Sequence, residues 1–198
     1  ETMDIFVAGP QGQSPIRVIK APNKQWVNTD PAWSPDGRAL ANVLLATEPS
    51  TIQVRGADGQ GARTLRGDPS RWHYYPEWSP DGRWLVAGCH DNAVHLWVPT
   101  ADMELQMSGY ETKLLELGFS RDSKWLATGG GRDACIWDCT GAGPEGREPL
   151  LLPHATRVCA VAFQNQHGLL ATAALGGEFC LWAPTRKNPL IAEVKMPV

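Results

Sequence analysis

The stretch Trp33-Ser34-Pro35-Asp36-Gly37 recurs three more times along the chain in altered form. The related stretches are Trp78-Ser79-Pro80-Asp81-Gly82, Phe119-Ser120-Arg121-Asp122-Ser123 and Phe163-Gln164-Asn165-Gln166-His167-Gly168. Their leading aromatic residues are 45, 41 and 44 positions apart. A period of about 40–45 residues is typical of the four-stranded blades of a β-propeller rather than of helical repeats. The repeat therefore predicts an all-β fold made of radially stacked blades.

The last repeat shows most clearly how one unit folds. Short apolar runs at 158–163, 169–174 and 179–182 are separated by tight turns, and residues 189–196 can add a fourth strand. Short β-prone runs with this spacing predict an antiparallel meander. Both faces of the 158–163 run are apolar, which indicates a sheet that is covered by neighbouring sheets on both sides.

We expect the 198 residues to form one propeller array rather than two domains. The expected units are a half blade at 1–22 and four blades at 23–67, 68–109, 110–152 and 153–198. This gives about 4.5 blades of four antiparallel strands, fewer than a closed ring of ordinary size carries. Two interpretations stay open. The chain is a piece of a longer propeller, or it is an open array that self-associates through exposed blade edges.

Composition narrows the classes of partner. The chain is 42% hydrophobic and carries a net charge of −3, without a Lys/Arg run that could neutralise a phosphate backbone, so nucleic acid is not expected. No apolar run reaches the roughly 18 residues of a membrane span. Five cysteines, an odd number, indicate free thiols and a cytoplasmic location. The chain begins at Glu1 rather than Met, so the absence of a signal peptide has little weight.

The repeats resemble the WD40 repeat. The resemblance rests on Leu152-Pro153-His154, Leu170-Ala171-Thr172, Leu181-Trp182 and the Trp-Asp pair of Cys135-Ile136-Trp137-Asp138, and it covers roughly residues 68–185. Blade one, with its Asp30-Pro31-Ala32-Trp33 stretch, is closer to the TolB-type propeller repeat. The resemblance implies a non-catalytic scaffold that binds proteins or peptides on the loop faces of the ring.

WD40 blades often contain a hydrogen-bond network of His, Ser or Thr, Trp and Asp. In blade four His154, Thr172 and Trp182 match the network, but Gly176 stands in the Asp position. We therefore expect His154 to bond to another partner or to water, and packing to supply most of the stability. The resemblance assigns structural roles to Trp97, Trp137, Asp138, His154, Thr172 and Trp182.

The other two blades depart further from the network. In blade three Tyr110 replaces the His, while Thr128 and Trp137 remain. In blade two Asp91 lies six residues before Trp97, but the loop position holds no His. No blade is therefore expected to contain the complete set.

The sequence predicts no catalytic, cofactor-binding or metal-binding site. Cys135 and Cys139 would be about 13 Å apart along a strand, too far for two ligands of one zinc ion. Cys89-His90-Asp91 contains the residue types of a nucleophilic triad, but neighbours along a strand face opposite ways. Gly129-Gly130-Gly131-Arg132 lacks the Lys-Ser/Thr pair and the helix of a phosphate loop, so we expect a hairpin turn.

The best candidate for partner binding is Arg71-Trp72-His73-Tyr74-Tyr75. We expect it to be a loop between blades one and two, on a ring face near the channel, with Trp26 in a similar place before blade one. Exposed aromatic residues and Arg are favoured anchors in interfaces. The alternative is that these rings pack between adjacent blades or fill the channel.

These observations favour a non-catalytic scaffold that binds a protein or peptide partner. An alternative is the propeller portion of a larger, hydrolase-linked enzyme or of a TolB-like envelope complex. The nucleophile elbow Gly-x-Ser-x-Gly is absent, so catalysis in that case would lie outside these residues. A small ligand in the central channel is a third and weaker hypothesis.

Overall fold

A computed structural model describes residues 3–45, 49–65, 70–101 and 103–197. In these ranges the chain forms eighteen β-strands and no helix, arranged as four four-stranded antiparallel sheets and one two-stranded sheet. The predicted all-β propeller of about 4.5 blades is therefore confirmed. None of the described segments is a helix long and apolar enough to cross a membrane.

Each sheet is a meander of strands that are consecutive in the sequence. The N-terminal pair consists of β1 (Ile5–Val7) and β2 (Ile16–Ile19). Blade one contains β3 (Val27–Trp33), β4 (Ala39–Leu45), β5 (Thr51–Gly56) and β6 (Arg63–Thr64). Blade two contains β7 (His73–Trp78), β8 (Leu85–Cys89), β9 (Val94–Val98) and β10 (Met103–Met107). Blade three contains β11 (Leu117–Phe119), β12 (Trp125–Thr128), β13 (Asp133–Asp138) and β14 (Leu150–Pro153). Blade four contains β15 (Val158–Phe163), β16 (Leu170–Ala174), β17 (Glu178–Trp182) and β18 (Leu190–Lys195).

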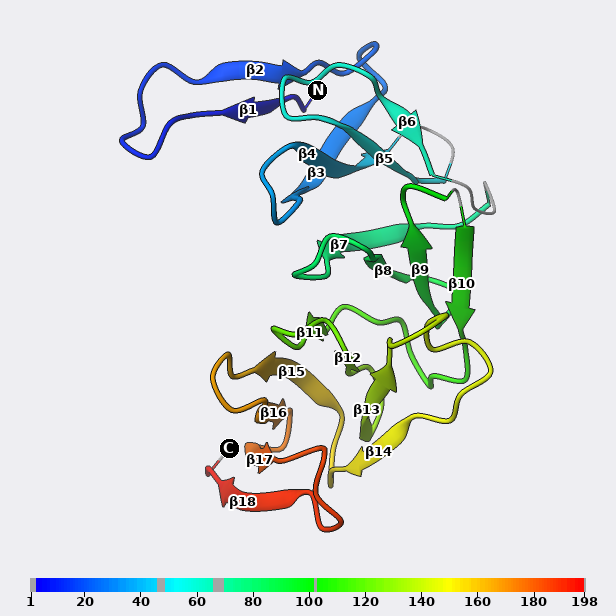
Figure 1. Cartoon of the computed structure of the whole chain (residues 1–198), viewed down its shortest axis with the longest axis vertical. Helices are drawn as coiled ribbons and strands as arrows, with labels where there is room; N and C mark the ends of the chain where they lie inside the picture. Colours follow the sequence, from blue (N-terminus) through cyan, green and yellow to red (C-terminus); the bar gives the residue numbers. More distant parts are fainter. Residues whose placement is uncertain (1–2, 46–48, 66–69, 102, 198) are drawn as a thin grey trace.

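The sheets follow one another along an open arc (Figure 1). The first strands of the blades, β3, β7, β11 and β15, lie towards the hollow side of the arc, and β6, β10 and β14 lie along its outside. The last strand of blade one, β6, has only two residues, and the expected boundary between residues 67 and 68 lies outside the described residues.

The core lies between successive sheets rather than within one. The core between blades two and three, for example, joins Trp84 and Leu105 to Leu126 and Trp137. A fully buried large apolar side chain contributes roughly 1.5–3 kcal/mol, more than a typical hydrogen bond. Packing between blades is therefore the main source of stability. The core between blades one and two includes Val43, Ile52, Leu85 and Trp97. The core between blades three and four includes Ile136, Leu152, Leu170 and Trp182.

Small residues in the second strand of a blade allow the segment that enters the next blade to pack closely against that strand. A Cβ atom at Gly88 in β8 would lie only 1.9 Å from the carbonyl oxygen of Leu114. The Gly129–Arg132 segment forms the turn between β12 and β13, as the sequence predicts.

The recurring Ser-x-Asp sequence closes the hairpin between the first two strands of a blade. In blade one the Ser34 hydroxyl donates to Asp36 Oδ1 over 2.6 Å, and this oxygen also accepts the backbone N–H of Arg38 over 3.0 Å. Such a side-chain bond replaces a backbone bond in a tight turn. The same hydroxyl–carboxylate bond recurs over 2.6 and 2.7 Å in the pairs Ser79–Asp81 and Ser120–Asp122.

Blade four departs from the expectation of two covered faces. Cys159 in β15 and Phe179 in β17 are exposed, the latter by 50%, because no further sheet packs on that side of the blade. Trp33, at the end of β3, is likewise 46% exposed. The apolar pattern of a strand shows that a neighbouring sheet could cover that face, but it does not show that such a sheet is present.

Candidate functional site

The segment Arg71–Tyr75 is only partly a loop. β7 begins at His73, so three of its five residues are in the first strand of blade two, which corrects the expectation of a loop. Trp72, just before the strand, is 37% exposed, and Tyr75 is 55% exposed. Tyr74 is half-buried, with the Lys113 ammonium 5.7 Å from its ring centre. Trp72 and Tyr75 therefore supply the large exposed rings of this segment.

Tyr75 has a strained backbone. Its φ of 49° is in the left-handed region, and the residue stands before Pro76 inside a bulge between Tyr74 and Glu77. Asp30 has the same φ before Pro31, in the matching bulge of β3. Residues that are not glycine rarely adopt this conformation, and such strain is concentrated at functional sites. The bulge takes Tyr75 out of the strand ladder on the hollow side of the arc.

Two residues of the segment are held inside the blade instead. His73 is 3% exposed, and burial, followed by the charge of His95, lowers the pKa of its imidazole to about 4. The expectation that His73 belongs to an exposed surface is therefore wrong. Arg71 donates from Nε to Asp91 Oδ2 over 3.2 Å and from a terminal nitrogen to Gln106 Oε1 over 3.3 Å. Trp26 is half-buried before β3.

The network expected in blade four is present. Thr172 Oγ1 lies 2.7 Å from His154 Nε2 and accepts the indole N–H of Trp182 over 2.8 Å. The carboxylate position at Gly176 stays empty, and His154 Nδ1 instead donates to the carbonyl oxygen of Leu152 over 2.9 Å, so this imidazole has found another partner. Glu178 lies in the next strand and accepts the backbone N–H of Ala155 over 2.8 Å.

In blade three a phenol replaces the imidazole. The Tyr110 hydroxyl accepts the indole N–H of Trp137 over 2.7 Å and lies 2.8 Å from Thr128 Oγ1. Burial raises the pKa of Tyr110, so the phenol stays protonated. Asp138 turns outward, where a hydrogen bond from the Thr140 hydroxyl lowers the pKa of its carboxyl, assisted by the guanidinium of Arg147.

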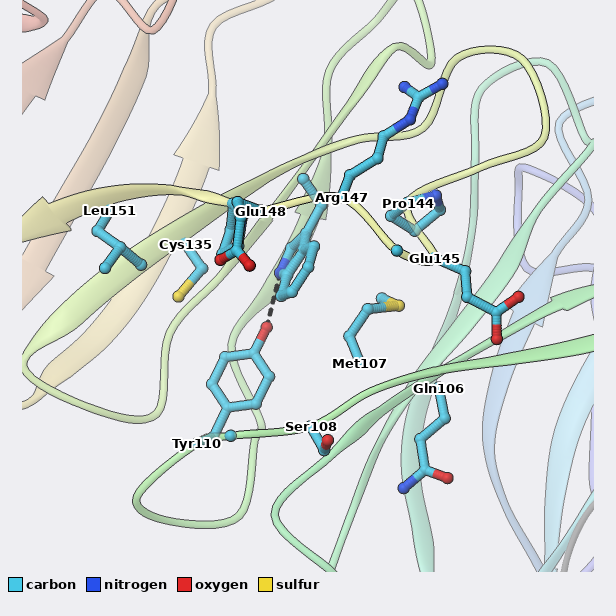
Figure 2. A pocket seen from close by; sticks show the side chains of 14 residues that line it. Gln106, Met107, Ser108, Tyr110, Cys135, Pro144, Glu145, Arg147, Glu148 and Leu151 are labelled. Atoms are coloured by element: carbon cyan, nitrogen blue, oxygen red, sulfur yellow. Dashed lines mark hydrogen bonds between the residues drawn. The ribbon is translucent and has the colours of Figure 1, made fainter.

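A cavity of about 350 Å³ lies beside this network, between β10 and the segment that leads into β14. Trp137 is one of its lining residues. Figure 2 shows Met107 and Tyr110 on its walls, with Glu148 nearby. Leu151 on its rim is 53% exposed. The lining mixes apolar side chains with the charged groups of Glu145, Arg147 and Glu148.

Burial raises the pKa of the buried cysteine thiols. Cys89 Sγ lies 3.7 Å from His90 Nδ1, but burial raises the pKa of this thiol to about 12. Burial likewise raises the pKa of Cys135 to about 11 and that of Cys139 to about 12. Thiols with such pKa values are inert at neutral pH. Cys89 lies instead beside His73 and His95, a group that the sequence did not predict.

The comparisons with known proteins agree with this geometry. Residues 73–98 and 104–138 match the family described as WD domain, G-beta repeat. The fold is that of a WD40 β-propeller. A chain in the solved structure titled "Crystal Structure of Mitotic Checkpoint Complex" is similar over 97% of this chain, with a TM-score of 0.77 and 20% sequence identity. A search of the curated proteins finds no match.

The match to that solved chain has limits of its own. This chain spans 60% of the solved chain's length, and at 20% identity the likeness concerns the fold. The matched repeats are those of blades two and three, although blade four is the one that contains the His–Thr–Trp hydrogen bonds. WD40 propellers are typically scaffolds for protein interaction and are generally not catalytic.

Proposed function

We propose that this WD40 chain is a non-catalytic scaffold that binds a protein or peptide partner on the ring face that exposes Trp72 and Tyr75. The observation that carries the proposal is the exposure of these two rings, 37% and 55%, next to the bulge of β7. Aromatic side chains bury large areas in interfaces and dominate their energetics.

Further observations support partner binding over chemistry. The buried thiols have raised pKa values, and a similar solved chain belongs to a structure titled as a complex. All five cysteines are free, so we keep the proposal of a reducing, cytoplasmic setting. The proposal of a hydrolase-linked or TolB-like protein lacks such an observation.

The experiment compares partner capture by matched variants. Trp72→Ala combined with Tyr75→Asn removes both rings, and Asn tolerates the left-handed backbone at position 75. The control is Trp33→Ala, because Trp33 is 46% exposed at the other end of an equivalent first strand. Tagged chains capture proteins from a lysate of the source cells, and quantitative mass spectrometry compares the bound sets after circular dichroism shows that each variant is folded.

We expect the double variant to lose one or more proteins that wild type and Trp33→Ala both retain. Each lost protein is then purified and titrated against the wild-type chain to establish direct binding. Equal capture by all three chains would remove this surface from the proposal.

A further inference from the structure

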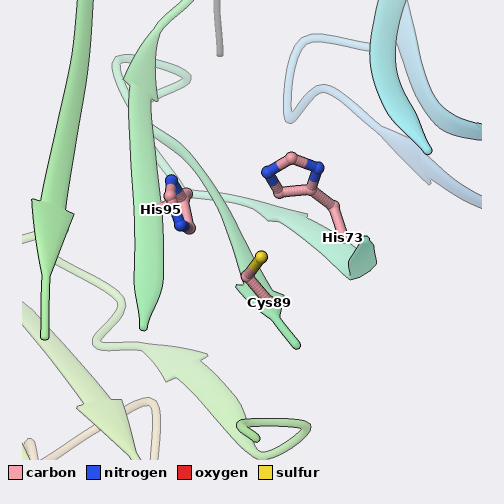
Figure 3. A group of neighbouring side chains, drawn as sticks. All are labelled: His73, Cys89 and His95. Atoms are coloured by element: carbon pink, nitrogen blue, oxygen red, sulfur yellow. The ribbon is translucent and has the colours of Figure 1, made fainter. Parts of the chain in front are cut away.

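Three side chains with metal-binding atoms lie on one face of blade two. His73 in β7 is paired with Cys89 in β8, and His95 in β9 is paired with Ala87, two residues before Cys89. Because side chains alternate along a strand, Cys89 and Ala87 share a face, and so do their partners. The ligand atoms of His73, Cys89 and His95 all lie within 4.8 Å of one another, and the three residues are buried (Figure 3).

The environment of His73 is unusual, because its buried imidazole lacks hydrogen-bond partners among the described residues. Its side chain is buried, yet neither ring nitrogen has a hydrogen-bond partner among the described residues. Its backbone N–H donates to Ser50 Oγ over 2.6 Å, so the residue is held in place. Buried polar atoms are nearly always paired, and an exception indicates a missing water, ion or ligand.

One ring nitrogen of His95 contacts a carboxylate, as is usual for an imidazole that binds a metal through its other nitrogen. The His95 side chain is 0% exposed, and Glu104 Oε1 lies 2.6 Å from Nδ1. A carboxylate on one nitrogen fixes the proton there and leaves the lone pair of the other nitrogen for a metal. That other atom, Nε2, lies 3.2 Å from Asp91 Oδ2.

The spacing of the two imidazoles also fits a shared ion. Their ring centres are 5.2 Å apart. Two imidazoles bound at about 2.0 Å to one tetrahedral ion have ring centres about 5 Å apart. Ligand atoms in such a site are about 3.3–3.8 Å apart, so those of the cluster need to close by about 1 Å.

A second group in blade four shows what a group without a ligand looks like. His154, Glu178 and Cys180 also lie within 4.8 Å of one another and are buried. Both nitrogens of His154 have partners, however, in Thr172 Oγ1 and the carbonyl oxygen of Leu152. This group is complete without an ion and therefore provides the matched control.

We infer that blade two binds a structural zinc ion through His73, Cys89 Sγ and His95 Nε2, and that the Asp91 carboxylate, which lies outside this three-residue cluster but 3.2 Å from His95 Nε2, moves in as the fourth ligand. Thiolate and imidazole are the ligands that zinc favours, and four protein ligands form a closed structural site. Cys89 releases its proton to solvent as the zinc–sulfur bond forms. The ion joins β7, β8, β9 and the turn between β8 and β9.

The surrounding charges suit a divalent ion. The three positive charges of zinc and Arg71 equal the three negative charges of the Cys89 thiolate, Asp91 and Glu104. Arg71 lies 3.3 Å from His95 Nε2 and must move as the ion binds, while its contacts with Asp91 and Gln106 keep the guanidinium nearby.

Cobalt titration of the complete 198-residue chain tests the site. The chain is stripped with a chelator and titrated with Co²⁺, whose spectrum reports tetrahedral geometry and thiolate ligation. We expect one equivalent to bind, with a thiolate-to-cobalt charge-transfer band that zinc abolishes by displacement. Cys89→Ser removes the band, and Cys180→Ser retains it. Glu104→Gln retains the ligands but weakens Co²⁺ binding 10- to 100-fold, roughly the effect of losing a group that orients a ligand.

Three results would overturn the site. They are a folded wild-type chain that binds no stoichiometric Co²⁺, a thiolate band that survives Cys89→Ser, and a band that Cys180→Ser removes. Circular dichroism establishes the folding of each variant. If Cys89→Ser does not fold, the wild-type stoichiometry and the Glu104→Gln affinity decide the question.

Discussion

Trp137 donates its indole N–H to the Tyr110 hydroxyl over 2.7 Å, in the place where Trp182 of the next blade donates to a threonine. In blade three the phenol reaches between Trp137 and Thr128, whereas in blade four Thr172 stands between the indole and the imidazole of His154. Two chemically different side chains thus complete the same connection between the third strand and the segment that enters the blade.

Tyr110→Phe should destabilise the chain although it removes only one oxygen. The change leaves the indole N–H of Trp137 and the hydroxyl of Thr128 buried without their partner. An unsatisfied buried group costs about 1–3 kcal/mol, so we expect the free energy of unfolding to fall by about 2 kcal/mol. Urea unfolding measures the loss. Tyr75→Phe is the control, because that tyrosine is 55% exposed, and equal stability of the two variants would contradict the role of Tyr110.

Thr172→Val tests the network of blade four with an isosteric change. Valine keeps the shape but cannot accept the indole N–H of Trp182 or bond to His154. We expect a loss of about 1–3 kcal/mol in the free energy of unfolding, measured in urea. The exposed Thr185 provides the control Thr185→Val, which should change stability by no more than about 0.5 kcal/mol. A loss of the same size in both variants would show that the network is not the cause.

The blades could be predicted because their signals are local. The Ser34–Asp36 hydrogen bond closes a hairpin between residues that are two positions apart. The sequence of each turn can therefore be recognised locally, and its recurrence gives the length of the repeat. The roles of Thr172 and Trp182 followed from the resemblance, and the structure shows their hydrogen bond. The bond from the Ala155 N–H to Glu178 could not be found in this way, because it joins residues that are 23 positions apart in the sequence.

The cluster in blade two was missed for a related reason. His73 and His95 are 22 positions apart and come together only through the registers of two strand pairs. The segment Arg71–Tyr75 reads as an aromatic surface because the sequence does not show that His73 faces the core. Interfaces between distant segments therefore set the limit of prediction from one sequence.

The Ser-x-Asp turns should make the chain sensitive to acid. A hydrogen bond from the Ser34 hydroxyl, followed by one from the Arg38 N–H, lowers the pKa of Asp36. In Asp122 burial raises the pKa, but hydrogen bonds from Ser120 and Lys124 outweigh it and lower the pKa overall. A lowered pKa in the folded state contributes stability above the unfolded value of about 3.9, and this contribution is lost as the pH falls through the folded pKa.

Asp36→Asn combined with Asp122→Asn should therefore flatten the acid side of the stability profile. We expect the variant to be less stable than wild type at neutral pH and to lose less stability between about pH 5 and pH 2. Urea midpoints with a chelator present measure both profiles without a contribution from bound metal. Glu145→Gln is the control, because no described residue forms a hydrogen bond with the Glu145 side chain. A profile as steep as that of wild type would show that other carboxylates dominate.

Blade four ends the arc with an uncovered apolar face. Phe179 in β17 is paired with Val194 in β18, and these neighbours are 50% and 57% exposed. Alternate residues of β17, Glu178 and Cys180, are buried on the side that faces blade three. The exposed side thus has the character of an inter-blade surface, and contiguous apolar patches of this kind promote association.

Phe179→Lys combined with Val194→Lys should keep the 198-residue chain monomeric at concentrations where the wild type self-associates. The lysines place two like charges at the centre of the exposed face, so bringing two copies together there would desolvate unpaired ammonium groups. Sedimentation velocity over a range of concentrations measures the distribution of species. Leu150→Lys is the control, because Leu150 is 38% exposed on β14 of blade three and lies away from this face. A wild-type chain that stays monomeric throughout, or an equal effect of Leu150→Lys, would show that the face of blade four does not drive association.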